Sequence, residues 1–226
     1  MNKKLLSFAL AIAMLSSMAT SAFANSGYDR DKVSKVEDTA IKEITISGID
    51  KAFEGAEKGN GTAKVELNNA EQVTPDALKK VAEVAKQKGV QAIIQADKTL
   101  GYMVIGRLYI NPVKAADLKE PIKLDLDTDN VATRSTFERY FENQLAIVKF
   151  AQPKTFGMPI RIAVKLDLSK IDTTKALRFY SYDSVANTYA EVSETNYVID
   201  KNGYIHFTTE RAGDILISDS PLVAKN

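Results

Sequence analysis

The chain of 226 residues contains no cysteine and no tryptophan, and it has a single histidine, His206. Without cysteine the protein can form no disulfide, thiolate metal site or cysteine nucleophile, so its apolar core alone must hold the fold. A single histidine excludes zinc sites that need two or more histidines, and the absence of cysteine excludes Cys–His catalysis. The lack of tryptophan removes the side chain best suited to stacking on sugar rings.

Motifs of common enzymes are also missing. The sequence has no G-x-S-x-G nucleophile elbow, so a Ser-His-Asp triad would have to be built around His206 without that turn. The glycines at positions 55, 59 and 61 do not match either phosphate-binding spacing. Paired carboxylates for glycoside hydrolysis meet only in the fold, and catalytic glycosidases usually need a larger scaffold. We therefore predict that the protein is not an enzyme.

The first 24 residues have the pattern of a signal peptide. Lys3 and Lys4 precede an apolar run over residues 5–15, and Ala22-Phe23-Ala24 forms a small-x-small cleavage site. Cleavage after Ala24 leaves 202 residues and changes the formal net charge from +1 to −1. We expect a secreted or cell-surface protein with no membrane insertion after cleavage, and the leader style suits a Gram-positive bacterium. No basic run points to nucleic acid.

Two helices are predicted inside a β-rich chain. Thr74, Pro75 and Asp76 form a helix start, apolar residues recur at positions 78, 81, 82 and 85, and Gly89 ends the helix. A second helix is expected from Ser135, where Ser135 and Glu138 match a capping box. Its aromatic residues, at positions 137, 140 and 141, have helical spacing and are expected to face the core.

The remaining segments read as about ten strands. A possible strand at residues 44–46 and a loop at 54–61 precede the regular domain. The longest alternation, residues 160–168, predicts a central strand with one solvated face, and residues 177–219 predict an antiparallel meander. We predict a mainly β fold (α+β possible), an antiparallel β-sandwich with two helical embellishments. The expected organisation is a signal peptide (1–24), a partly flexible tail (25–62), the β-sandwich-like domain (63–222) and a C-terminal tail (223–226).

Two groups of polar residues are weak candidates for metal or acid–base chemistry. Asp125, Asp127 and Asp129 resemble the start of an EF-hand loop, but the positions that need glycine and a bidentate glutamate hold Asn130 and Thr136. An acidic turn before a helix is the simpler interpretation, so calcium is a weak candidate and no other cofactor is expected. His206 follows the alternation of its strand and is expected on the surface.

Tyrosines are the remaining candidates for a binding site. Tyr180 and Tyr182 share one face of a predicted strand, and Tyr189 and Tyr204 lie on neighbouring strands. If these side chains converge outward, they form an amphipathic surface that could stack sugar rings or bind a protein. The alternative is cross-strand aromatic pairing that stabilises the sheet. The exposure of these tyrosines distinguishes the two interpretations.

Three segments of the C-terminal region, residues 179–183, 189–192 and 200–208, resemble the closing hairpins of modules in exported Firmicutes surface proteins. That resemblance implies a β-sandwich stalk or binding module of adhesins, cell-wall proteins or polysaccharide-binding systems. We therefore expect a non-catalytic extracellular module with a structural, adhesive or protein-binding role at the cell surface. The alternative is a carbohydrate-binding module that uses surface tyrosines. The expected partner is an extracellular protein or a cell-surface polysaccharide.

Overall fold

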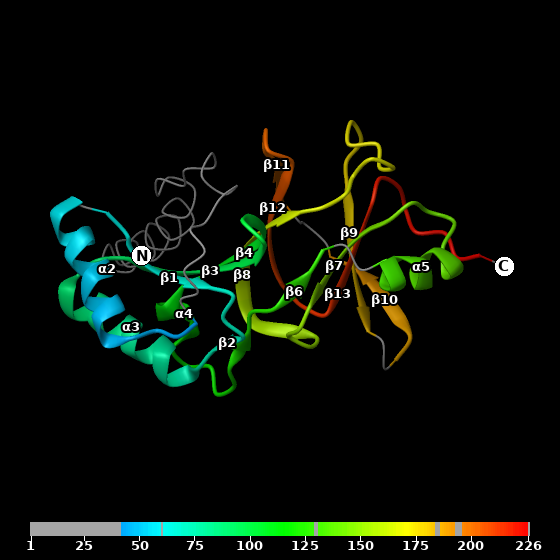
Figure 1. Ribbon diagram of the computed structural model, residues 1–226. Helices are drawn as coiled ribbons and strands as arrows, with labels where there is room; N and C mark the ends of the chain where they lie inside the picture. Colours follow the sequence, from blue (N-terminus) through cyan, green and yellow to red (C-terminus); the bar gives the residue numbers. More distant parts are fainter. Residues whose placement is uncertain (1–41, 60, 129–130, 184–185, 193–195, 226) are drawn as a thin grey trace, which may run out of the picture. The chain divides into compact units, whose positions relative to one another are not determined.

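The computed structural model describes residues 42–59, 61–128, 131–183, 186–192 and 196–225, and it confirms a mainly β fold (Figure 1). The predicted signal peptide lies outside the described residues. The helices are α2 (Ile46–Gly59), α3 (Pro75–Lys88), α4 (Pro112–Ala115) and α5 (Val131–Tyr140). None of them is both long and apolar enough to cross a bilayer.

The strands are divided between two large sheets and one small one. The six-stranded sheet has the order β1 (Ala63–Asn68), β3 (Ala92–Leu100), β4 (Met103–Ile110), β8 (Thr155–Lys165), β12 (Tyr204–Arg211) and β11 (Tyr197–Ile199). The five-stranded sheet has the order β10 (Thr188–Glu191), β9 (Arg178–Asp183), β13 (Asp214–Ser218), β7 (Ala146–Phe150) and β6 (Leu126–Asp127). β2 (Gln72–Val73) pairs with β5 (Ile122–Lys123).

Strand pairing confirms one expectation and corrects another. β8 lies between β4 and β12, so the long alternating segment is an interior strand as predicted. Its second face is not solvated as predicted, because Ala163 is buried and Arg161 and Lys165 are half-buried. The C-terminal strands do not form one meander, because β9, β10 and β13 join the five-stranded sheet whereas β11 and β12 join the six-stranded sheet. β1 and β3 pair in parallel, with α3 in the connection between them, and the other pairs are antiparallel. Sequence alternation gives each strand a buried face but does not identify its partner.

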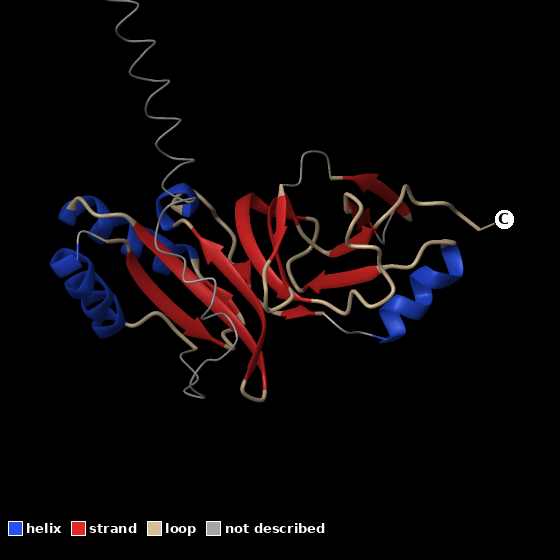
Figure 2. Cartoon of the chain, turned by 90° about the horizontal axis from the view of Figure 1, so that it is seen from above, coloured by secondary structure: helices blue, strands red, loops and turns tan. Residues whose placement is uncertain are grey.

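One apolar core joins the two sheets and three helices. The inner face of the six-stranded sheet presents alternating residues such as Ile94, Leu108 and Ile162 to this core. Buried residues from α2, α3 and α4 and from β7, β9 and β13 belong to the same cluster. Figure 2 shows α2, α3 and α4 beside the six-stranded sheet and α5 near the C-terminus. The two sheets therefore pack as a sandwich around this core, and α2, α3 and α4 contribute further residues to the same core.

Helix α3 forms as its sequence predicts. The Thr74 hydroxyl accepts a hydrogen bond from the Ala77 N–H at 3.3 Å, which caps the first turn. The predicted apolar stripe is buried, and Gly89 ends the helix with φ of +65°, a left-handed conformation that favours glycine. The capping threonine, the apolar stripe and the terminal glycine all indicate the same helix, so the local sequence was sufficient to predict it.

Helix α2 replaces the strand and loop predicted for this region. It begins at Ile46, and the Thr45 hydroxyl accepts a hydrogen bond from the Gly48 N–H at 3.1 Å at its start. Ile49, Phe53 and Ala56 are buried in the apolar core. Their spacing, i, i+4 and i+7, is helical, so the period over the whole segment outweighs the short alternation around Thr45. This part of the predicted tail therefore belongs to the folded domain.

Helix α5 covers the outer face of the five-stranded sheet. It starts at Val131, so Ser135 lies inside the helix and does not cap it. Phe137 and Phe141 are buried as predicted, whereas Tyr140 is exposed. Phe137 and Phe141 form a second core with Ile147, Tyr180 and Leu216 of the sheet and with Leu145, which precedes β7. In total, the described residues contain four helices where the sequence predicted two.

We predict that Phe53→Ala destabilises the protein by about 3 to 5 kcal/mol, because it removes a fully buried ring from the shared core. Urea denaturation of the chain from residue 25 to residue 226 measures this change. The exposed Lys51 of the same helix provides the control, and Lys51→Ala should change stability by less than about 0.5 kcal/mol. Equal effects of the two variants would show that α2 does not pack as described.

Candidate functional site

Three of the four candidate tyrosines meet around α5. Tyr182 packs edge-to-face on Phe137, with ring centroids 4.8 Å apart, and Tyr189 packs in the same way on Phe141 at 5.1 Å. Tyr180 is buried and lies 6.2 Å from Tyr189. Such pairs contribute about 0.5 to 1.5 kcal/mol each beyond their buried area. The cluster attaches α5 to the sheet, in agreement with the interpretation as structural aromatic pairing.

Tyr204 lies in the other sheet, so the four tyrosines do not form one surface. Its side chain is 1% exposed, and its hydroxyl donates a hydrogen bond to the Val104 carbonyl oxygen at 2.5 Å. The Lys165 ammonium lies 5.2 Å from the ring centroid, within cation–π distance. Of the four candidates, Tyr189 is the one classed as exposed, at 42%.

The acidic candidates do not gather into a metal site among the described residues. The Asp125 carboxylate pairs with the Lys98 ammonium at 2.5 Å and also accepts a hydrogen bond from the Leu126 N–H. Asp127 lies in β6, and Asp129 lies outside the described residues. Within the described ranges no three carboxylate or histidine side chains converge as a metal ion would require.

The tip of the β3–β4 hairpin carries an apolar group that sequence analysis missed. Leu100 is 69% exposed, Tyr102 74% and Met103 43%. Leu100 pairs with Met103, so Gly101 and Tyr102 form a two-residue turn. Gly101 has φ of +59°, the conformation that a type II′ turn requires at its first position. We refer to residues 100–103 as the apolar tip.

Polar contacts at the base hold the apolar tip in place. Asn69, from the end of β1, donates a hydrogen bond to the Thr99 hydroxyl at 2.7 Å and accepts one from the Thr99 N–H at 2.9 Å. The Lys98–Asp125 ion pair adds a contact from the loop before β6. The tip is therefore supported on two sides. The signal for it was an apolar L-G-Y-M run at a position where turns are normally polar.

The outer face of the six-stranded sheet carries a layer of buried polar side chains. At its centre, Arg107 of β4 forms a bidentate ion pair with Asp97 of β3, and the Nη2–Oδ2 distance is 2.6 Å. Gln95 completes the group, because its side-chain oxygen accepts hydrogen bonds from Arg107 at 3.2 and 3.3 Å when its amide is oriented to satisfy both ends. All three residues are between 6% and 7% exposed.

Burial and pairing act in opposite directions on this ion pair. Burial raises the pKa of Asp97, and the hydrogen bond and charge of Arg107 act against that rise. For Arg107, burial favours a lower pKa, but the hydrogen bond and charge of Asp97 outweigh it and the pKa is raised. Because arginine stays protonated at physiological pH, we treat the pair as ionised. It is a fixed structural charge pair and is unsuited to proton transfer.

The layer continues across β8 and β12. The guanidinium of Arg161 lies 5.7 Å from the ring centroid of Tyr109. His206 is buried, contrary to its predicted surface position, and its Nε2 lies 2.9 Å from an oxygen of Asp200. A carboxylate can only accept, so Nε2 carries the proton in this contact. We call Gln95, Asp97, Arg107, Tyr109, Arg161, Tyr204 and His206 the polar layer.

Asp200 organises the β11–β12 turn. One carboxylate oxygen accepts hydrogen bonds from the N–H groups of Asn202 and Tyr204, both at 2.9 Å, and the other contacts His206. Although burial acts to raise the pKa of Asp200, the hydrogen bonds with His206 and the two backbone N–H groups outweigh it and lower the pKa. His206, which was predicted to lie on the surface, therefore contacts the residue that organises the turn between β11 and β12.

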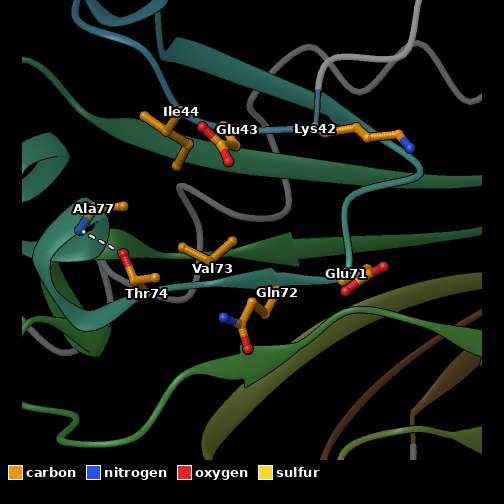
Figure 3. Close-up of a pocket in the computed structure, with 8 residues that line it drawn as sticks. All are labelled: Lys42, Glu43, Ile44, Glu71, Gln72, Val73, Thr74 and Ala77. Carbon is orange, nitrogen blue, oxygen red and sulfur yellow. Dashed lines mark hydrogen bonds between the residues drawn. The ribbon is translucent and has the colours of Figure 1, made fainter.

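A pocket of about 470 Å³ lies between the start of α3 and the segment that leads into α2 (Figure 3). Figure 3 shows Lys42, Glu43 and Ile44 across from Thr74 and Ala77. The hydrogen bond drawn between lining residues is the cap of α3. Thr74 and Ala77, which line the pocket, thus form the N-terminal cap of α3. We assign no chemistry to this pocket.

No known family model matches this chain, and no curated protein matches it either.

We predict that Asp200→Asn lowers stability by about 2 kcal/mol at pH 7, because charge-assisted hydrogen bonds are lost. The folded-state pKa of Asp200 is lowered, so its contribution is complete above the unfolded pKa of about 3.9 and is lost progressively as the pH falls from there through the lower folded-state pKa. Urea denaturation at pH 7 and pH 3 should show the gap between wild type and variant closing.

Asp117→Asn, at an exposed position, is the matched control and should show no gap at either pH. A gap for Asp200→Asn that is equally large at pH 3 would contradict the assignment of an ionised carboxylate at this turn.

Proposed function

We propose that the chain is an exported, non-catalytic module of a bacterial cell surface that binds another protein through the apolar tip. The observation that carries the proposal is the exposure of three large apolar residues, Leu100, Tyr102 and Met103, around Gly101. Contiguous apolar exposure on a folded domain marks interaction sites more often than scattered apolar residues do. The leader sequence and the resemblance of the C-terminal segments support export to the cell surface.

The chemistry of the tip favours a protein partner. Tyrosine and methionine are enriched in protein interfaces, and Tyr102 has an apolar ring with a hydroxyl at its end. The positive charge nearest in sequence, on Lys98, is paired with Asp125, which makes the tip a poor ligand for an anionic membrane. The expected occupant of the interface is an extracellular protein with an apolar cleft.

Anchoring makes the tip an efficient ligand. Binding costs free energy when loops and side chains must be ordered, at roughly 0.5 to 1.5 kcal/mol per rotamer-rich side chain. The two Asn69–Thr99 hydrogen bonds and the two-residue turn fix the backbone of the tip before any partner arrives. Less ordering is therefore required on binding than for a long loop of the same composition.

The positions of the tyrosines favour this proposal over a carbohydrate-binding module. A sugar platform would use several outward tyrosines on one face. Tyr180 and Tyr204 are at most 4% exposed, and they belong to different sheets. Their rings are occupied by contacts that stabilise the fold.

The proposal is tested by photo-cross-linking with a benzoylphenylalanine residue at position 102 of the mature chain. Incubation with the cell-surface protein fraction of the source bacterium should give one discrete adduct. Tyr140 provides a matched control, because it is a tyrosine of comparable exposure (56%) on α5. The same reagent at position 140 should not give that adduct.

A competition experiment tests whether the apolar tip is the part of the chain that binds the cross-linked protein. Excess wild-type chain should abolish the adduct, and the Leu100→Ser/Tyr102→Ser variant should compete at least about tenfold less well, a difference of about 1.4 kcal/mol. Equal adducts at both positions, equal competition by the variant, or capture of polysaccharide in place of protein would contradict the proposal.

A further inference from the structure

The five-stranded sheet has a free edge at β10. This strand pairs with β9 on one side, and no other described strand pairs with it. All four of its residues, Thr188–Glu191, are exposed. Figure 1 shows β10 beside α5, in agreement with the ring contact between Tyr189 and Phe141. A free strand edge presents a row of backbone N–H and C=O groups that can pair with another strand.

Two residues of β10 direct their backbone groups to the free edge. The Val192 N–H donates a hydrogen bond to the Phe179 carbonyl oxygen at 2.7 Å, so these two residues form a hydrogen-bonded pair of the β9–β10 ladder. Along an antiparallel ladder, such pairs alternate with pairs that exchange no hydrogen bond. Ala190 therefore bonds to β9, whereas the N–H and C=O groups of Tyr189 and Glu191 point away from β9.

The residues of β10 do not block pairing at this edge. Many edge strands are protected by proline, by lysine or by a bulge. β10 contains neither proline nor lysine, and its register with β9 runs without a shift. Its one charge, on Glu191, is already paired with Arg178 at 2.8 Å. β11, at the edge of the six-stranded sheet, is shorter, and its residues Tyr197 and Ile199 pack against the core. β10 is therefore the more accessible edge.

We infer that β10 pairs with β10 of a second copy of the chain, in antiparallel orientation about a two-fold axis at Ala190. In this register Tyr189 faces Glu191 of the second copy, and Glu191 faces Tyr189 of the second copy. Both members of each pair direct their backbone groups to the edge, so each pair can exchange two hydrogen bonds. The same surface serves both copies, as a two-fold interface requires.

Charge and backbone conformation select this register over its neighbours. An axis at Glu191 would place two carboxylates directly opposite each other, which is destabilising. An axis at Tyr189 would pair Glu191 with Asn187, whose φ of +53° takes it out of the extended strand. An axis at Ala190 avoids both problems. Its small side chain also suits a pair without hydrogen bonds, in which the Cα atoms approach to about 4.5 Å.

The ring of Tyr189 adds apolar contact at the same interface. It is 42% exposed even though it packs on Phe141. Diagonal neighbours across an antiparallel pair lie about 7 to 8 Å apart, within reach of aromatic side chains, so the two Tyr189 rings can meet near the axis. Val223, 48% exposed, lies near this ring, because its neighbour Ala224 forms a bridge with Phe141. Hydrogen-bonding groups, rings and charges thus all match themselves under the two-fold rotation, which favours a second copy over an unrelated peptide.

This inference goes beyond the proposed function and does not rest on it. A two-fold dimer carries two apolar tips, one on each copy, and two linked tips bind paired sites with higher avidity than one tip does. The pairing also closes the free edge, so no further strand can be added there. Because self-association is measured on the chain alone, its failure would leave the proposal for the apolar tip standing.

Sedimentation equilibrium of the chain from residue 25 to residue 226 tests the inference. The wild-type chain should form a dimer that dissociates on dilution. Ala190→Lys and Ala190→Glu each place like charges at the axis and should each raise the dissociation constant at least about fivefold. An equimolar mixture of the two variants places opposite charges there and should restore the dimer. Misfolded variants could not produce that restoration.

Val198→Lys is the matched control, because Val198 is 44% exposed and lies in β11, the edge strand of the other large sheet. It should leave the dissociation constant unchanged. A wild-type chain that is monomeric up to its highest soluble concentration would overturn the inference. So would a dimer that Ala190→Lys leaves intact, a mixture that stays monomeric, or dissociation by Val198→Lys.

Amide hydrogen exchange tests the wild-type chain without any substitution. When the protein concentration is raised through the dissociation constant, the N–H groups of Tyr189 and Glu191 should exchange at least about tenfold more slowly. The N–H of Ala190, which bonds to β9 in monomer and dimer alike, should change less. Exchange at Tyr189 and Glu191 that does not depend on concentration would overturn the inference, even if the chain forms a dimer through another surface.

Discussion

The Asp97–Arg107 ion pair defines the constraint on which this structure depends: both faces of the six-stranded sheet are buried. On the inner face, alternating aliphatic residues meet three helices and a second sheet. On the outer face the same strands present charged and aromatic side chains that contact one another. A buried pair of this kind stabilises little compared with an apolar pair, but losing one partner is costly. It therefore specifies which strands must be neighbours.

Because both faces of the sheet are buried, its polar side chains are used in contacts that hold the fold and are not available to bind a partner. Asp97, Arg107, Asp200 and His206 are the residues that would attract attention in a search for acid–base chemistry. Their hydrogen-bonding groups hold β3 to β4 and close the β11–β12 turn. The exposed apolar tip has the opposite character, because its side chains have little to do with the core. We therefore base the proposed function on the tip.

The sequence was informative where several local signals agreed. Thr74, Pro75 and Gly89 marked both ends of α3, and two of the three aromatic residues of α5, Phe137 and Phe141, were correctly assigned to a core. It was misleading where a signal was short: three residues around Thr45 suggested a strand, whereas the spacing of Ile49, Phe53 and Ala56 over two turns indicated the helix. Strand alternation also identified β8 as an interior strand.

Properties that depend on non-local pairing could not be predicted in this way. Alternation places His206 on the face opposite Phe207, but it does not tell whether that face meets solvent. The same limitation applies to Tyr180, which the sequence placed beside Tyr182 without showing the helix above it. The apolar tip was missed because turns are normally polar, whereas here Gly101 and Tyr102 form the turn between the paired residues Leu100 and Met103.

A double-mutant cycle on Asp97 and Arg107 tests the two-faced sheet most directly. Asp97→Leu and Arg107→Met should each destabilise the mature chain by about 3 to 5 kcal/mol. The double variant should lose at least about 2 kcal/mol less than the sum of the two. A coupling below about 1 kcal/mol, the range of exposed ion pairs, would show that this face is open to solvent and would contradict the account.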